Sequence, residues 1–267
     1  MDEKITSRQN RQIKQLRALH DKKGRDQQKA FIVEGWRLTA EVLASDYQVQ
    51  NAFFSPRFLT LKQGQEQLDL LYKRQIPVFE LSEELLAYAA ATENPQGIVL
   101  TVEQKALTPP SFSTLPKRIV VLDGLADPGN VGTVLRTAAA CSCDLLISCG
   151  NTADLYSPKV VRSSMGGLFR LPVCRLAAVS EAVAFLRSLN AQIFIADSRG
   201  ESLFALKQLP EKTAFIFGSE AFGPAPEWIK QADQIVSLPM HNGVESLNVA
   251  VTAAVIMYEI FRRDLKK

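Results

Sequence analysis

Residues 239–260, PMHNGVESLNVAVTAAVIMYEI, join a polar loop to an apolar helix. From Leu247 onward the stretch is rich in Ala and Val without a breaker, which predicts a helix with little polar surface. The loop before it crowds Glu245, Ser246 and Asn248 at the first turn. A helix N-terminus presents unpaired N–H groups and a partial positive charge, so these residues either cap the helix or face a ligand. The loop alone leaves both possibilities open.

The composition indicates a two-domain protein without membrane segments. The chain has 267 residues, of which 46% are hydrophobic, enough for two packed cores. The start, MDEKITSRQNRQIKQ, is charged rather than signal-like, and the longest apolar stretch is too short for a bilayer. We therefore expect a soluble, cytoplasmic protein.

The cysteines and histidines predict no metal site. The chain has no C-x-x-C pair, and neither histidine stands at zinc spacing from a cysteine, so we expect buried free thiols. The residues concerned are Cys141, Cys143, Cys149, Cys174, His20 and His241.

Charge is concentrated at the N-terminus. Residues 1–37 hold ten Lys or Arg and five acids, a net +5, against +3 for the whole chain. The excess suggests contact with a phosphate backbone. A solvated amphipathic helix explains it equally well.

Alternating strands and helices predict two α/β domains. A helix capped by Thr6 or Ser7 should reach about Lys22, and short strands and helices then alternate up to residue 102. Three prolines mark a linker at 105–117 between domains 1–104 and 118–267. In the second domain, continuous apolar strands (118–125, 144–148, 191–197, 213–220 and 234–239) indicate a parallel sheet covered by helices on both faces.

Three loops follow strands of this sheet, where ligands of parallel sheets bind. They are DGLADPGNVG (123–132), GSEAFGP (218–224) and PMHNGVES (239–246), and none is a dinucleotide fingerprint or a P-loop. Taken singly, each loop leaves two interpretations open. Asn130 is a helix cap or a site residue, and Arg136 is a surface ion-pair partner or a site residue. Gly218 and Gly223, on either side of Glu220, permit a simple turn or the close approach of a ligand.

Together the loops resemble the SpoU/TrmH family of SPOUT RNA 2′-O-ribose methyltransferases. The motifs are LDGLADPGNVGTVLRTA (122–138), FIFGSEAFG (215–223) and LPMHNGVESLNVAVTAA (238–254), with SPKVVRSSMGGLFRLPV (157–173) as the connecting segment. The N-terminal region resembles the family's substrate-binding domain, akin to RNA-binding ribosomal proteins.

The resemblance implies a trefoil-knotted parallel sheet covered by helices, preceded by a small α/β ribosomal-protein-like domain. It implies S-adenosylmethionine as the cofactor, held in the knot, and a homodimer formed by the helix after Leu247. The polar loop is then expected to face the ligand. The cofactor-binding candidates are Gly218, Leu238, Leu247, Phe217, Met240 and Gly243.

The same resemblance places Arg136 at the ribose hydroxyl, with Asn130, Glu220, Ser246 and Asn248 around it. A guanidinium rarely loses its proton, so Arg136 would stabilise the developing alkoxide, or Glu220 or a phosphate would assist. His241, in the cofactor loop, is a further candidate base.

The expected partner is a structured RNA, and the two-domain layout favours 23S ribosomal RNA over tRNA. The alternatives are a non-catalytic RNA-binding dimer and an enzyme acting on a small molecule or protein. The candidates for RNA contact are Arg8, Arg11, Lys14, Lys22, Lys23, Arg25, Lys159 and Arg162. Of these, Lys159 and Arg162 are expected near the catalytic loops.

Overall fold

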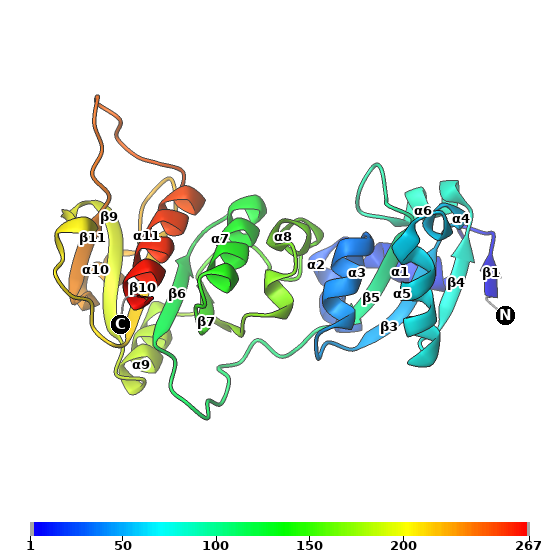
Figure 1. The fold of residues 1–267 in the computed structure, drawn as a ribbon, viewed down its shortest axis with the longest axis horizontal. Coiled ribbons are helices and arrows are strands. Elements are labelled where there is room, and N and C mark those ends of the chain that lie inside the picture. Colours follow the sequence, from blue (N-terminus) through cyan, green and yellow to red (C-terminus); the bar gives the residue numbers. More distant parts are fainter. Residues whose placement is uncertain (1–2, 266–267) are drawn as a thin grey trace. The chain divides into compact units, whose positions relative to one another are not determined.

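The computed structural model describes residues 3–265, which form two compact units, each a sheet flanked by helices (Figure 1). The first unit has a five-stranded sheet in the order β1-β4-β3-β5-β2, in which β5 is antiparallel to β2 and β3. Its strands are β1 (Glu3–Ile5), β2 (Ala30–Glu34), β3 (Val49–Phe54), β4 (Val78–Leu81) and β5 (Ile98–Glu103).

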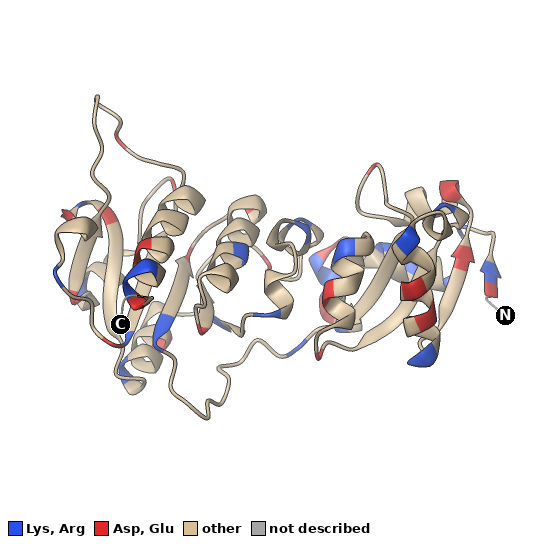
Figure 2. Cartoon of the chain, viewed as in Figure 1, with Lys and Arg blue, Asp and Glu red and all other residues tan. Residues whose placement is uncertain are grey.

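Helices cover this sheet. Apolar residues of α1 and α6 share one core cluster with the strands, and α3 packs with α5. Lys and Arg are spread over several elements of this unit, with acidic residues among them (Figure 2). The helices are α1 (Arg11–Ala18), α2 (Lys22–Gln28), α3 (Trp36–Leu43), α4 (Pro56–Leu59), α5 (Lys62–Lys73) and α6 (Glu83–Ala89).

The first helix differs from the sequence prediction, which joined α1 and α2 and placed the cap at Thr6 or Ser7. Asn10 caps α1 by accepting from the backbone N–H of Gln12 at 2.7 Å. The break follows from the close approach of α2, since a Cβ at Gly24 would lie 1.8 Å from the carbonyl oxygen of Ala18. Two strands, β1 and the later β8, were not predicted.

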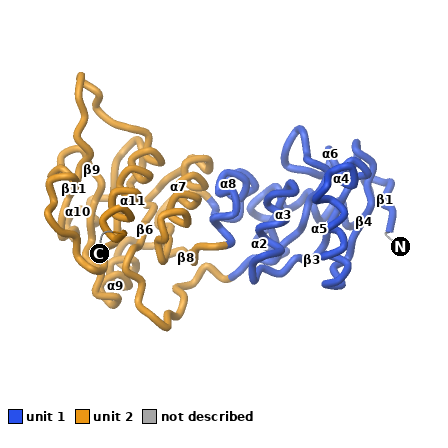
Figure 3. Tube along the Cα trace, in the orientation of Figure 1, with its two compact units in different colours: residues 1–105, 154–169 blue, residues 106–153, 170–267 orange. Residues whose placement is uncertain are grey.

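A segment from the middle of the chain belongs to the first unit (Figure 3). Residues 154–169, which contain α8 (Pro158–Ser164), pack against β2. The ring of Tyr156 lies 4.7 Å from that of Phe31, and Arg25 donates to Asp154 at 2.6 and 3.0 Å. The second unit therefore lacks residues 154–169 of the predicted domain 118–267, because this segment packs against Phe31 and Arg25 of the first unit.

The second unit is built on a parallel sheet in the order β11-β9-β10-β6-β7-β8. Strands β6, β7 and β10 are buried along their whole length, as continuous apolar runs predict for a covered sheet. The strands are β6 (Arg118–Asp123), β7 (Leu145–Cys149), β8 (Val173–Leu176), β9 (Gln192–Ser202), β10 (Thr213–Gly218) and β11 (Gln234–Ser237).

Helices α9 and α10 pack together on one face of the sheet, over a core that includes Leu186 and Trp228. Helices α7 and α11 pack against each other, and α11 also contacts β10. No helix among residues 3–265 has the length and apolar character needed to cross a membrane. The helices are α7 (Pro128–Ala140), α9 (Val179–Ser188), α10 (Pro226–Gln231) and α11 (Val249–Asp264).

The four cysteines are free, as expected. Cys143 is half-buried and the other three are buried. Burial raises the pKa of the Cys141 thiol to about 11 and those of Cys143, Cys149 and Cys174 to about 12. The thiols are therefore protonated and unreactive near neutral pH.

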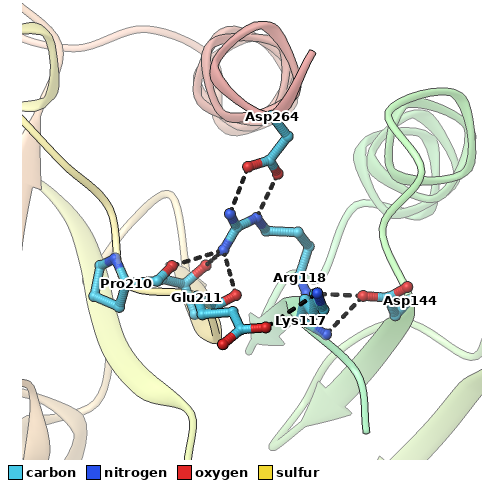
Figure 4. A network of polar contacts seen from close by, with 7 residues as sticks. Lys117, Arg118, Asp144, Pro210, Glu211 and Asp264 are labelled. Atoms are coloured by element: carbon cyan, nitrogen blue, oxygen red, sulfur yellow. Dashed lines mark hydrogen bonds and ion pairs between the residues drawn. The ribbon is translucent and has the colours of Figure 1, made fainter. Parts of the chain in front are cut away.

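Arg118 ties the far end of α11 to the sheet (Figure 4). Its guanidinium donates to both carboxylate oxygens of Asp264, at 2.7 and 2.8 Å, and to the carbonyl oxygens of Pro210 and Glu211, each at 2.9 Å. The Arg118 side chain is only 10% exposed, so these contacts replace hydration that it has lost. The network fixes where α11 ends.

We predict that Arg118→Leu lowers the free energy of unfolding by about 2 kcal/mol, because it removes the partner of the Asp264 carboxylate and of two partly buried carbonyl groups. The matched control is Arg262→Leu, which removes a 51% exposed arginine from its pair with Glu259 and should lower the free energy of unfolding much less. Denaturant titration measures both, and equal losses would contradict the anchoring role.

Candidate functional site

One amide group joins the N-terminus of α11 to two other loops. The side-chain oxygen of Asn248 accepts from the N–H groups of Ala250 (2.9 Å) and Val251 (3.3 Å) and so caps the helix. Its Nδ2 donates to Asn130 Oδ1 at 3.2 Å and to Glu220 Oε1 at 3.5 Å. Asn248 is therefore a helix cap, as one interpretation of this loop predicts, and its nitrogen also joins it to polar side chains of two other segments.

Asn130 completes the polar cluster. Its Nδ2 donates to the same Glu220 oxygen, so Asn130, Glu220 and Asn248 form a closed triangle across three loops. Asn130 is not the cap of its own helix, because α7 begins at Pro128 and Asp127 accepts from the Asn130 N–H at 2.8 Å. Its amide side chain is thereby available to the cluster.

The loop after β10 folds tightly upon itself. A Cβ at Gly218 would lie 2.1 Å from the Pro224 nitrogen and 2.4 Å from the Gly223 carbonyl carbon. Asp123, at the end of β6, holds the far side of this loop by accepting from the Ala225 N–H at 2.8 Å. Gly218 is thus required by the chain's own backbone, in agreement with the tight turn that is one of its two predicted roles.

A cavity of about 460 Å³ opens beside this loop, between the middle of β9, the ends of β10 and β11, and the start of α11. Of the sequence candidates, eight line it and three do not. Those lining it are Phe217, Gly218, Glu220, Leu238, Met240, Ser246, Leu247 and Asn248. Those outside the lining are Asn130, Arg136 and Gly243.

Strand β9 contributes residues to the cavity lining that were not predicted from the sequence. Asp197 and Ser198 line the cavity, and β9 continues past them to Ser202. Arg199 donates to both carboxylate oxygens of Asp197, at 2.9 and 2.8 Å, and this hydrogen bonding lowers the pKa of Asp197. The signal was an acidic residue at the end of an apolar run, QIFIAD. A carboxylate here could accept from the hydroxyls of a bound ribose.

Arg136 lies on the exposed side of α7. Within the described part of the chain, its guanidinium has no hydrogen bond or ion pair, so the ion-pair interpretation finds no support. An unpaired guanidinium remains free to meet an incoming anionic group. His241 is also exposed, and it does not line the cavity.

The RNA-contact candidates separate into exposed and buried groups. Arg25 is 3% exposed, and it bonds Asp154 and the carbonyl oxygens of Leu19 and His20. We therefore correct its assignment, since a buried, paired guanidinium cannot reach a phosphate. Lys159 and Arg162, expected near the catalytic loops, lie on α8 in the first unit. The exposed candidates are Arg8, Arg11, Lys14, Lys22, Lys23, Lys159 and Arg162.

Among residues 3–265, no group of three or more His, Cys, Asp or Glu side chains could hold a metal ion.

Both parts of the chain match known families. Residues 117–258 match the SpoU rRNA Methylase family, and residues 10–100 match the MRM3-like substrate binding domain. An uncharacterized tRNA/rRNA methyltransferase of Synechocystis sp. is 34% identical over 97% of this chain and 94% of its own. The 23S rRNA (guanosine(2553)-2′-O)-methyltransferase RlmP of Bacillus subtilis is 28% identical over 96% of this chain and 98% of its own.

Solved structures agree along the same length. The AdoMet-bound rRNA methyltransferase from Sinorhizobium meliloti matches 98% of each chain, with a TM-score of 0.87 and 26% identity. The SpoU methyltransferase AviRb from Streptomyces viridochromogenes, in complex with AdoMet, matches 96% of this chain and 99% of its own. Its TM-score is 0.83 and its sequence identity is 27%. This chain belongs to the SpoU rRNA methylase family, and the SPOUT fold class expected from the resemblance is confirmed.

The two roles of Asn248 can be separated by substitution. Asn248→Ser keeps a side-chain oxygen that can cap α11 but removes the Nδ2 donor without adding a charge beside Glu220, whereas Asn248→Ala removes both. We predict that Ala costs about 1 kcal/mol of stability and Ser far less, because Ser is an equally good cap. Thermal unfolding of the two variants measures the difference. Equal losses would show that the bonds to Asn130 and Glu220, and not the cap, stabilise this helix end.

Proposed function

We propose that this chain transfers the methyl group of S-adenosylmethionine to a ribose 2′-OH of 23S ribosomal RNA. The observation that carries the proposal is the polar triangle of Asn130, Glu220 and Asn248 beside the cavity, in a chain of the SpoU rRNA methylase family. Two relatives that align along nearly the whole chain are named as 2′-O-methyltransferases of 23S rRNA.

The cavity fits the cofactor in size and chemistry. Its volume, about 460 Å³, falls within the range of small-molecule sites. Phe217, Leu238 and Met240 offer apolar walls for an adenine ring, and Asp197 offers an acceptor for ribose hydroxyls. The backbone at Gly218, Leu238 and Leu247 would hold the cofactor. Gly243 lies outside the lining, which leaves it an indirect role in shaping the loop.

Bound S-adenosylmethionine supplies an electrophilic methyl group, and the chain must position a hydroxyl and stabilise its oxygen. Asn130 and Asn248 donate to one Glu220 oxygen and so orient the carboxylate, whose second oxygen can accept from the ribose hydroxyl. Ser246, at the cavity wall, adds a hydroxyl to the same rim. Arg136 would approach the 2′-oxygen as negative charge develops on it.

Gly218→Ala tests the cofactor site. The new Cβ would lie 2.1 Å from the Pro224 nitrogen, so the loop that forms one wall of the cavity must move. We predict at least about tenfold weaker S-adenosylmethionine binding by titration calorimetry. The control is Leu59→Ala, at a 43% exposed leucine of the first unit, which should bind nearly normally. Wild-type affinity in a folded Gly218→Ala variant would refute the assigned site.

Arg136→Ala tests the chemistry. If the guanidinium acts only as charge develops, its loss slows the chemical step and spares binding. We predict single-turnover methylation of 23S rRNA about a hundredfold slower, with near-normal affinity for cofactor and RNA. Lys at this position should restore only part of the rate, because it lacks the planar fork.

The matched control is Arg57→Ala, which removes an exposed arginine of the first unit and should leave the rate unchanged. A near-normal rate for Arg136→Ala would make Glu220 and His241 the next candidates. RNA binding by the wild-type chain without any methyl transfer would favour the non-catalytic RNA-binding dimer instead.

The homodimer is also a proposal. Helix α11 presents an exposed apolar stripe of Val251 (49% exposed), Val255 (37%) and Tyr258 (53%), continued by Phe204 (53%) and Leu265 (71%). Large apolar patches of this kind mark protein interfaces. A two-fold dimer through α11 would cover the stripe, as the resemblance implies.

Sedimentation velocity at micromolar concentration should give twice the chain mass of 29.5 kDa. We predict that Val255→Glu shifts the protein to the monomer, because it would bury a charge in the interface. Leu70→Glu, at a 44% exposed leucine of the first unit, is the control and should remain dimeric. A wild-type monomer would contradict the proposed assembly.

A further inference from the structure

The first unit contains a hollow lined by uncharged amide side chains. Its volume is about 320 Å³, and it lies between α1, the end of α2, and strands β3 and β5. Of the described residues, eight line it, and none of them carries a formal charge. The polar ones are Gln12, Gln15, Gln28, Gln50, Asn51 and Thr101.

The local backbone directs these amides to one place. Gln12 and Gln15 stand three residues apart on α1 and so share a face of the helix. On β3, Val49 pairs with Val102 and Asn51 with Thr101, which leaves Gln50 as an extra residue in the ladder. Such a bulge re-aims side chains, and it accounts for two consecutive residues, Gln50 and Asn51, lining one hollow.

Much of the hydrogen-bonding capacity of the hollow is unused. Gln28 donates to the Gln15 carbonyl oxygen at 3.0 Å, and Asn51 donates to Thr101 Oγ1 at 3.1 Å. Within residues 3–265, the side chains of Gln12, Gln15 and Gln50 make no hydrogen bond. Each amide offers both donors and an acceptor. Leu16 and Phe53, 0% and 1% exposed, form an apolar floor beneath them.

Basic side chains stand at the rim. A second hollow shares Gln15 and Gln28 with the first and is also lined by Arg11 and Lys14, both exposed. An uncharged amide pocket with an apolar floor matches a nucleobase, and an adjacent cationic rim matches its phosphate. An anion or a metal ion would instead require charged groups inside the hollow.

We infer that this hollow is a nucleobase pocket that receives an unstacked base of the RNA substrate, with Arg11 and Lys14 contacting the flanking phosphates. The inference rests on the proposed action on RNA and adds a site of base recognition to it. RNA-binding proteins recognise single-stranded bases by their edges and faces, and the hollow offers amide groups for an edge and an apolar floor for a face. Specificity for the RNA would then arise in the first unit.

The direct test uses the full-length protein with ¹⁵N-labelled glutamine side chains. Each of the four ribonucleoside 5′-monophosphates is added in turn, and ribose 5-phosphate, which lacks the base, is the matched control. At least one nucleotide should shift the side-chain resonances of Gln12, Gln15 or Gln50, and ribose 5-phosphate should not. No shift with any nucleotide, or the same shifts with ribose 5-phosphate, would overturn the inference.

Variants extend the test to RNA. Gln12→Leu with Gln15→Leu should weaken binding of a 23S rRNA transcript about tenfold at unchanged salt dependence, since no charge is lost. Arg11→Ala with Lys14→Ala should instead flatten the salt dependence. The control is Gln27→Leu, an exposed glutamine of α2 outside the hollow, which should bind normally. Gln50→Ala gives an independent variant if the double change impairs folding.

Methyl transfer by the same preparation separates the two proposals. If the protein methylates 23S rRNA but no nucleotide shifts its glutamine side-chain resonances, the base pocket alone is refuted. If the resonances respond to nucleotides but no methyl is transferred, the base pocket is supported and the proposed activity fails.

Discussion

The site depends on the side-chain amide of Asn248, which caps α11 with its oxygen and joins Asn130 and Glu220 with its nitrogen. A helix N-terminus has unpaired N–H groups that need an acceptor, and Asn is among the best residues for that position. Here the cap also fixes the start of α11 against two other loops. Since Thr252 and Ile256 of α11 line the cavity, its wall is set by the same contact.

The opposite end of α11 is held by Arg118, so the helix is fixed at both ends. Between them lie the cavity wall and the exposed apolar stripe, on two sides of one helix. A shift of α11 along its axis would change both surfaces together. Assembly and cofactor binding are therefore expected to be coupled through this helix in the proposed enzyme.

The continuous apolar runs predicted the parallel sheet, and the resemblance to the SpoU/TrmH family predicted which loop residues gather beside the cavity. Eight of the eleven catalytic and cofactor candidates line the cavity, and Asn130 joins them through its bonds to Glu220 and Asn248. Asp197 was missed because its strand was expected to end there. The tight turn at Gly218 was predicted, but its contact with Pro224 was not, because no sequence pattern displays which backbone atoms meet.

Long-range pairing explains the remaining errors. Arg25 looked like a phosphate contact because it stands in a basic run, yet its partner Asp154 lies 129 residues further along the chain. The amide hollow was equally invisible, because it requires a bulge in β3 and two helices to meet. Side chains that act through distant neighbours cannot be assigned from local spacing.

Methyl transfer to a ribose of large-subunit ribosomal RNA can be measured directly. The purified protein is incubated with unmodified 23S rRNA and S-adenosylmethionine, and the product is mapped by mass spectrometry of nuclease digests. We expect a 2′-O-methylated nucleoside at a defined position of the RNA. A methyl group on a base, or transfer to tRNA and not to 23S rRNA, would contradict it.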